Sequence, residues 1–180
     1  MSDLHKKFKE EVIPKLKKDL NVENPMSVPA LSKIIVNIGV KDALSDKKNI
    51  ETVSMVLSQI TGQKPKITKA KKSIATFKLR EGDKIGLVVT LRGGRMYDYF
   101  EKLVNVVLPR LRDFHGLRRT SFDGHGNYTL GLTEYNVFTE IDPGKIEKLQ
   151  GMEMTIVTTA KNDKEGIALL EALGMPFVKG

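Results

Sequence analysis

Apolar residues recur at every fourth position near the start of the chain, with lysines between them: Leu4, Phe8, Val12, Leu16 and Leu20. This spacing places them on one face of a helix, so the pattern predicts an amphipathic helix over residues 1–20. Pro14 has no amide hydrogen to donate, and we expect it to bend or interrupt that helix.

Runs rich in β-branched residues predict the strands. The clearest runs are residues 32–39 and 84–92, and a shorter one covers residues 64–69. The last third of the chain adds strand-like runs at residues 128–132, 134–141 and 152–160. Short links join several neighbouring strands, which favours an α+β fold with a mostly antiparallel sheet and helices packed on one of its faces.

A second helix is predicted between Asp46, which can cap its start, and Gly62, which can end it. Its inner face consists of Ile50, Val53, Leu57 and Ile60. A third, longer helix follows Gly93-Gly94. Its apolar positions are Phe100, Leu103, Val104, Val107, Leu111 and Phe114, with an expected kink at Pro109.

The last predicted helix begins at Asn162, with Glu165 at the spacing of a capping box, and ends at Gly174 and Pro176.

Two stretches of the chain show neither helical nor strand periodicity. Residues 70–82 carry lysines around a single Phe77 and predict a protruding basic loop, while residues 115–131 predict a long functional loop. No repeat or low-complexity linker divides the chain, so we expect one domain over residues 1–180.

Strand periodicity gives the first indication of function. One face of each long strand is fully apolar, and the other face is mixed. If the two strands pair, Asn37, Thr90 and Arg92 share an open sheet surface, and the small Gly39 and Gly86 permit close approach. Such a surface suits an RNA backbone and its 2′-hydroxyls better than an apolar ligand. An ordinary solvated sheet face is the alternative.

The basic loop combines cations with an apolar contact point. Its basic residues are Lys69, Lys71, Lys72, Lys78 and Arg80, which accompany Phe77, Ser73 and Thr76. Phosphate neutralisation together with aromatic contact is typical of nucleic-acid binding without sequence reading. The alternative is a mobile surface loop with an incidental phenylalanine.

The charge distribution sharpens this interpretation. The chain has 30 basic and 22 acidic residues, hence a net charge of +8. Residues 121–180 contain five basic and nine acidic residues, so residues 1–120 hold a net +12 and the remainder −4. Residues 61–80 contain seven basic residues and no acidic one. We therefore predict a basic, RNA-facing region over about 1–120 and an acidic region over about 121–180 that meets a different partner.

Other chemistry is poorly supported. The chain has no cysteine and three histidines, which excludes disulfide frameworks, thiolate nucleophiles and cysteine-ligated metals. His115 and His125 lie near Asp113 and Asp123, yet no nucleophile accompanies them, and we expect neither an enzyme nor a metal or cofactor. Gly93-Gly94-Arg95 could seat a phosphate, although turn geometry explains it better. Without a long apolar run or secretion signal, we expect a cytoplasmic protein away from membranes.

Several long blocks of the chain are distinctive. They are KIIVNIGV (33–40), TGQKPKITKAKKSIATFKLREG (61–82), GLVVTLRGGRMYDY (86–99), RDFHGLRRTSFDGHGNYTLGL (112–132) and TIVTTAKNDKEGIALLEALGMPF (155–177). In these blocks the chain resembles, from end to end, the bacterial large-subunit ribosomal protein five family, whose members bind 5S rRNA in the central protuberance.

The resemblance implies a noncatalytic protein that is monomeric within the ribosome and contacts 5S rRNA, 23S rRNA, peptidyl-site tRNA and protein thirteen of the small-subunit head. By motif match, the residues at the 5S rRNA are Lys33, Asn37, Gln63, Lys64, Thr90 and Arg92. Those of the tRNA-facing loop are Lys71, Lys72, Ser73, Phe77, Lys78 and Arg80. The central to C-terminal part would meet the small-subunit protein in an intersubunit bridge.

Three residues depart from the family pattern. Thr76 stands where glycine is frequent, Gly94 where an acid is frequent, and Thr139 where the block usually reads Phe-Pro-Glu. Because threonine adopts positive φ far less readily than glycine, Thr76 puts the flexibility of the loop in question. The alternative function is an RNA chaperone or regulator that works off the ribosome.

Overall fold

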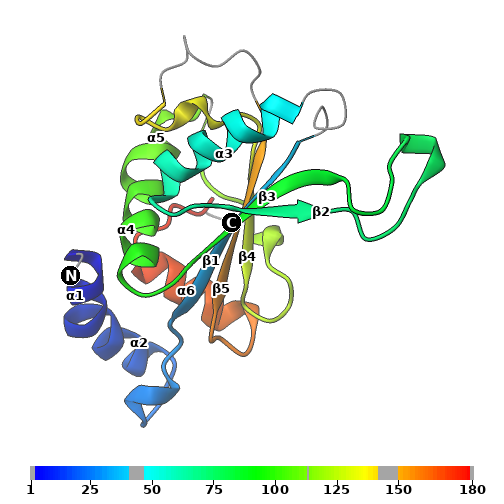
Figure 1. The fold of residues 1–180 in the computed structure, drawn as a ribbon. Coiled ribbons are helices and arrows are strands. Elements are labelled where there is room, and N and C mark those ends of the chain that lie inside the picture. Colours follow the sequence, from blue (N-terminus) through cyan, green and yellow to red (C-terminus); the bar gives the residue numbers. More distant parts are fainter. Residues whose placement is uncertain (1–2, 41–46, 113, 142–149, 179–180) are drawn as a thin grey trace. The chain divides into compact units, whose positions relative to one another are not determined.

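Helices and one five-stranded sheet make up the protein, shown in Figure 1 as a computed structural model that describes residues 3–40, 47–112, 114–141 and 150–178. The chain divides into two compact units. The first unit contains residues 1–34, 91–130 and 155–180, and the second contains residues 35–90 and 131–154. Each unit is assembled from segments distant in sequence.

The sheet confirms the predicted α+β fold and its antiparallel arrangement. Its strands are β1 (Leu31–Gly39), β2 (Lys66–Lys69), β3 (Lys84–Leu91), β4 (Tyr128–Leu132) and β5 (Met152–Thr158), in the spatial order β2-β3-β1-β5-β4. The two long strands predicted to pair, β1 and β3, are neighbours. Strand β2 pairs antiparallel with β3 in a register that sets Ile67 against Leu87.

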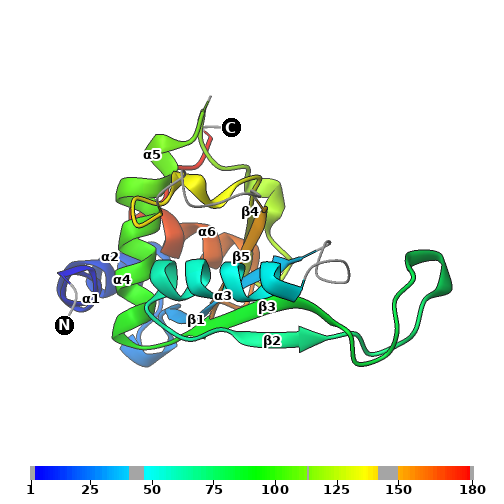
Figure 2. The ribbon, with the colours of Figure 1, turned by 45° about the horizontal axis from the view of Figure 1, so that its top comes forward.

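Helix α3 (Lys47–Thr61) belongs to the second unit, alongside β3 in Figure 2. Its predicted inner face is buried, since Ile50, Val53, Leu57 and Ile60 are each at most 4% exposed. The inward side chains of the neighbouring strands, among them Val36, Ile38, Leu87 and Val89, are buried as well. These apolar surfaces form the core of the second unit.

The helical segments of the first unit are interrupted at both predicted prolines. Helix α1 (Asp3–Lys7) continues through a π-helical turn, Phe8–Val12, into α2 (Ile13–Asp19), and α4 (Gly94–Lys102) continues through a π-helical turn, Leu103–Val107, into α5 (Leu108–Arg110). Each π turn ends two residues before a proline. Because proline removes an amide and crowds the preceding turn, the helix widens there.

Helix α6 (Asp163–Ala172) has the predicted cap at its start. The Asn162 side chain accepts a hydrogen bond from the Glu165 amide at 2.9 Å. The Glu165 carboxylate in turn accepts from the Lys161 amide at 2.9 Å, one residue earlier than in a standard capping box. Gly174, with φ of +93°, follows the helix.

Two sequence predictions are wrong. Residues 134–141 contain no strand: Tyr135–Val137 is a 3-10 turn, so Tyr135, Phe138 and Ile141 are buried by turns. The helix at 94–110 also ends before Leu111, whose ψ of 134° is extended, so neither Leu111 nor Phe114 is helical.

The predicted loop at 115–131 is shorter than expected. It contains the 3-10 turn Arg119–Ser121, and strand β4 already begins at Tyr128. The proposed cap Asp46 and the acid Asp113 lie outside the described residues. The single-domain prediction, with its division near residue 120, stays a prediction.

Candidate nucleic-acid interface

The open face of the sheet in the second unit comprises the outward side chains of β1, β2 and β3. On this face, Asn37 and Gly39 are exposed, and Ile35, Val88 and Thr90 are half-buried. The residues that alternate with them along each strand point to the other face and are fully buried. This alternation confirms the predicted two-sided character of both strands. Strand β2 adds Lys66 and Thr68, which the register places opposite Val88 and Gly86. The sequence prediction missed these two, although the alternation of β2 could have revealed them.

Gln63 and Thr90 are brought together at one end of this face. The Gln63 side-chain amide donates to the Thr90 carbonyl at 3.4 Å. The turn after α3 sets this geometry: Gly62, with φ of +64°, ends the helix, and the Thr61 hydroxyl donates to the Leu57 carbonyl at 2.7 Å. The Thr90 hydroxyl remains available because Gln63 contacts the backbone of Thr90.

The two glycines of the open face differ in their surroundings. A Cβ atom on Gly39 would meet nothing within 4 Å, so this position leaves room for a partner. A Cβ atom on Gly86 would lie 2.8 Å from the Ile38 carbonyl oxygen and 2.9 Å from the Thr68 hydroxyl. Gly86 is buried and permits close packing of the three strands, and only Gly39 fits the expected role in admitting RNA.

The remaining predicted residues lie at strand and helix ends. Lys64 is exposed between α3 and β2 in the second unit. Lys33 is half-buried on the Asn37 side of β1, and Arg92 is exposed directly after β3; both belong to the first unit. Among the described residues, no carboxylate forms an ion pair with these three cations, and their charges are available to phosphates.

Two lysines oppose each other where β2 and β3 lead into the loop. Lys69 pairs with Lys84 across the ladder, and both are exposed. Like charges at directly opposed positions destabilise a sheet unless an anion lies between them. Lys66 is exposed at the other end of β2, so this edge strand is a favourable place for a polyanion.

The segment 70–82 is a closed arm that projects from β2 and β3 (Figures 1 and 2). At its base, the Ala70 amide donates to the Asp83 carbonyl at 2.8 Å, and nearer its tip Ile74 and Leu79 form an antiparallel bridge. The Asp83 carboxylate accepts from the Arg80 amide at 2.7 Å, and the Ser73 hydroxyl accepts from the Glu81 amide at 2.9 Å. Hydrogen bonds therefore cross the arm between its two sides from the base towards the tip.

The tip of the arm is a 3-10 turn, Ala75–Phe77, that presents Phe77 with 70% of its surface exposed. Every residue from Lys71 to Lys78 is exposed, as is Arg80. Positive φ occurs at Lys78 (+51°), whereas Thr76 lies in the turn and is not among the positive-φ residues. The departure at Thr76 thus fits the backbone, and no glycine is needed at that position.

Asp123 and His125, one of the two acid–histidine pairs considered for catalysis, belong to a structural turn in the first unit. The Asp123 carboxylate accepts from the Asn127 side chain at 2.7 Å and from the amides of His125 and Asn127 at 2.9 and 3.1 Å. These hydrogen bonds, led by the Asn127 side chain, hold the pKa of Asp123 below its usual value. A carboxylate ionised and occupied in this way stabilises the turn and is a poor proton donor.

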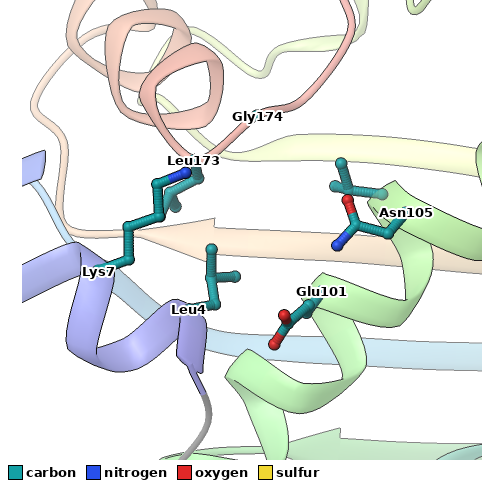
Figure 3. A pocket seen from close by; sticks show the side chains of 7 residues that line it. Leu4, Lys7, Glu101, Asn105, Leu173 and Gly174 are labelled. Atoms are coloured by element: carbon teal, nitrogen blue, oxygen red, sulfur yellow. The ribbon is translucent and has the colours of Figure 1, made fainter.

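A pocket of about 200 Å³ in the first unit, shown in Figure 3, does not suit a polyanion. Its lining residues are Leu4, Lys7, Glu101, Val104, Asn105, Leu173 and Gly174. The lining combines one lysine, one glutamate and one asparagine with apolar residues, and the volume is below that of typical small-molecule sites. We therefore assign the interface to the open face and the arm.

The described residues contain neither a membrane-crossing helix nor a metal-binding cluster. None of their helices combines the length and apolarity that a membrane-crossing segment requires. No group of three histidine, aspartate or glutamate side chains gathers there as metal ligands.

Comparison with known proteins agrees with these features. Residues 24–80 match the family described as Ribosomal protein L5, and residues 84–177 match the C-terminal family of the same ribosomal proteins. The chain is 53% identical over 178 residues to large ribosomal subunit protein uL5 of Mesoplasma florum, covering 99% of both chains. It is 55% identical over 174 residues to the protein of the same name from Thermobifida fusca, covering 97% of this chain and 91% of that one.

The chain belongs to the ribosomal protein L5 family. Membership confirms the predicted family and the expectation of a ribosomal, rRNA-binding protein of the cytoplasm that is not an enzyme. For an L5 protein, the open face and the arm are the surfaces whose chemistry suits RNA. The individual site residues and their RNA partners stay predictions.

Proposed function

We propose that the chain is a constituent of the large ribosomal subunit that binds 5S rRNA on its open face and helps to attach it to the central protuberance. The observation that carries this proposal is the two-sided sheet of the second unit. Its inner face is apolar and buried, and its outer face offers Asn37, Thr90, Gln63 and the open space at Gly39. Lys33, Lys64 and Arg92 supply cations at the ends of the contributing segments.

Binding of this kind makes and breaks no covalent bond. Cations release counterions from phosphates, and hydroxyl and amide groups form hydrogen bonds with riboses and phosphates. A preformed sheet selects RNA by shape because its side chains are held before the RNA arrives. The protein therefore lowers the free energy of one arrangement of the RNA.

The arm has a second proposed role, at the elbow of the peptidyl-site tRNA. Its support is the combination of Lys71, Lys72, Lys78 and Arg80 with an exposed Phe77 on a hydrogen-bonded hairpin. A third surface is proposed for the acidic region, the central to C-terminal part of the chain. We propose that it meets protein thirteen of the small-subunit head, since the exposed Glu134, Glu140 and Glu153 suit a basic protein. The protein would also contact 23S rRNA.

The first prediction concerns Thr90→Ala and Arg92→Ala. Each should weaken 5S rRNA binding, Thr90→Ala by about 0.5–1.5 kcal/mol for a lost hydrogen bond. Arg92→Ala should also reduce the slope of log affinity against log salt by about 0.9, the contribution of one phosphate contact. Filter-binding titrations at several salt concentrations measure both effects.

Matched controls for this test are Thr133→Ala and Arg95→Ala, which remove the same groups from exposed positions elsewhere. Both controls should bind 5S rRNA like the unaltered chain. Unchanged affinity of Thr90→Ala and Arg92→Ala would remove the assignment of the open face.

An RNA chaperone or regulator working off the ribosome is the second candidate, favoured by the nonspecific character of the basic arm. Co-sedimentation with large subunits in high salt separates the two functions. A constituent of the subunit should remain bound, whereas a transient chaperone should wash off.

A further inference from the structure

Asp123 and Gly124 form the only Asp-Gly pair in the chain. Because glycine has no side chain, its amide can approach the carboxyl group of the preceding aspartate with little steric hindrance. Both residues are exposed, so water reaches the pair from the solvent. The pair therefore has the composition and the exposure that favour conversion of aspartate to isoaspartate.

Isoaspartate forms in two steps that need only water as a reagent. The Gly124 amide nitrogen attacks the Cγ atom of the protonated Asp123 carboxyl group. A C–N bond forms, the C–O bond breaks, and the hydroxyl group leaves as water with the amide proton. A second water then opens the cyclic imide at the main-chain carbonyl of residue 123, so that the backbone continues through the side chain. One water is lost and one is gained, and nothing is oxidised or reduced.

The structure holds the carboxylate of this pair but not its amide. Among the described residues, the Gly124 amide donates no hydrogen bond. The Asp123 Oδ1 atom accepts from the amides of His125 and Asn127 at 2.9 and 3.1 Å, and its Oδ2 atom accepts from the Asn127 side chain at 2.7 Å. These donors favour the ionised carboxylate, which has no hydroxyl group to lose as water. Cyclisation therefore requires the carboxylate to be released.

The Asn127 side chain is fixed from its other side by Thr158, at the end of β5 and in the same unit. Its oxygen accepts from the Thr158 amide at 3.1 Å, while its nitrogen donates to Asp123. Gly126 is anchored as well, because its amide donates to the Asp163 carboxylate at 3.0 Å and its carbonyl accepts from the Thr158 hydroxyl at 2.8 Å. These contacts must open before the carboxylate can turn towards the Gly124 amide.

An isoaspartate at residue 123 would lengthen the backbone of this turn by one methylene group. The turn is closely packed, since a Cβ atom on Gly126 would lie 2.6 Å from the Ala160 Cβ atom. An antiparallel bridge between Phe122 and Tyr128 closes it at the base. The modified turn would therefore lose some of the contacts that hold it to the first unit.

We infer that Asp123-Gly124 is a site of isoaspartate formation, and that the Asn127 side chain keeps it unreacted in the folded chain by holding the carboxylate away from the Gly124 amide. The inference goes beyond RNA binding and does not depend on which RNA the chain binds. The pair reacts when the turn opens, and an isoaspartyl methyltransferase is the class of enzyme that would recognise the product.

The test incubates the full chain and its Asn127→Ala variant at neutral pH. The matched control is Asn136→Ala, which removes a side chain that donates to a different carboxylate, Glu134, at 2.7 Å. Asp123→Glu is a second control, because glutamate would have to form a larger cyclic imide, which closes more slowly. Isoaspartate is counted by methyl transfer from labelled S-adenosylmethionine with an isoaspartyl methyltransferase. Mass spectrometry with electron-transfer fragmentation locates it in the chain.

The folded, unaltered chain should form isoaspartate at residue 123 about tenfold or more slowly than the same chain unfolded in guanidinium chloride, because the reaction needs the turn to open. Asn127→Ala should raise the rate in the folded chain about threefold or more, since it removes a hydrogen bond to a charged carboxylate. Asn136→Ala should react like the unaltered chain, and Asp123→Glu should form no product at this site.

Four results would overturn the inference. They are equal rates in the folded and unfolded chains, no isoaspartate in the unfolded chain, a folded Asn127→Ala variant that reacts no faster than the unaltered chain, and an equal increase in Asn136→Ala. If circular dichroism shows that Asn127→Ala is unfolded, Asn127→Ser, which keeps a shorter polar side chain, is measured against the same expected increase.

Discussion

Gly39 and Gly86 lie on neighbouring strands of one sheet, and only atomic surroundings distinguish their roles. Sequence alternation places both on the open face, which is correct for their position along the strand. It could not reveal that the Ile38 carbonyl and the Thr68 hydroxyl crowd Gly86, because β2 reaches that point through a pairing distant in sequence. One glycine therefore serves packing, and the other leaves space.

This difference gives a stability prediction. Gly86→Ala should lower the free energy of unfolding by about 1–3 kcal/mol, since its Cβ atom would collide with backbone that cannot easily move. Gly39→Ala is the matched control and should change stability little, because its Cβ atom meets open space. Urea denaturation of the two variants measures the effect, and equal stability would show that the strands accommodate a side chain at residue 86.

Alternation along the strands correctly placed Asn37 and Thr90 on the open face, and their contact with RNA stays a prediction. Gln63 was placed at the site only by family resemblance, because its position depends on the turn after α3 and its contact with Thr90. Alternation sets Lys66 and Thr68 on one side of β2, but they were missed because the strand is short and its pairing with β3 fixes which side belongs to the open face.

At the scale of elements, long periodic patterns predicted the strands β1 and β3 and the helices α3 and α6 close to their observed bounds. The strand predicted at 134–141 is absent for a physical reason. The apolar residues of this run are buried, as the pattern requires, but turns are sufficient to bury them. The end of α5 was missed because Pro109 permits a helix to start but does not determine where it stops.

The arm is the element whose proposed role differs from that of the sheet. Charge-neutral substitution in K71Q/K72Q/K78Q should spare 5S rRNA binding and reduce the retention of peptidyl-site tRNA on assembled ribosomes, because these exposed lysines lie away from the open face. Nitrocellulose retention of labelled tRNA at the peptidyl site measures the loss.

The variant K15Q/K17Q/K18Q controls for the same change in net charge and should retain tRNA normally. An equal loss of 5S rRNA and tRNA binding in the arm variant would count against a separate role for the arm.

At the scale of the whole molecule, net charge indicates a polyanion partner but not where that partner binds. The structure places basic residues in two groups that suit a polyanion: the cations around the open face and those of the arm.

The central claim is that this chain binds 5S rRNA specifically. The most direct measurement is a titration of the purified full chain with a 5S rRNA transcript and with an unrelated RNA of the same length, at physiological salt. The account predicts a saturable one-to-one complex with 5S rRNA. Its affinity should be at least about tenfold higher than that for the unrelated RNA, which binds through nonspecific electrostatic attraction alone. Equal affinity for the two RNAs, or no complex with 5S rRNA, would contradict it.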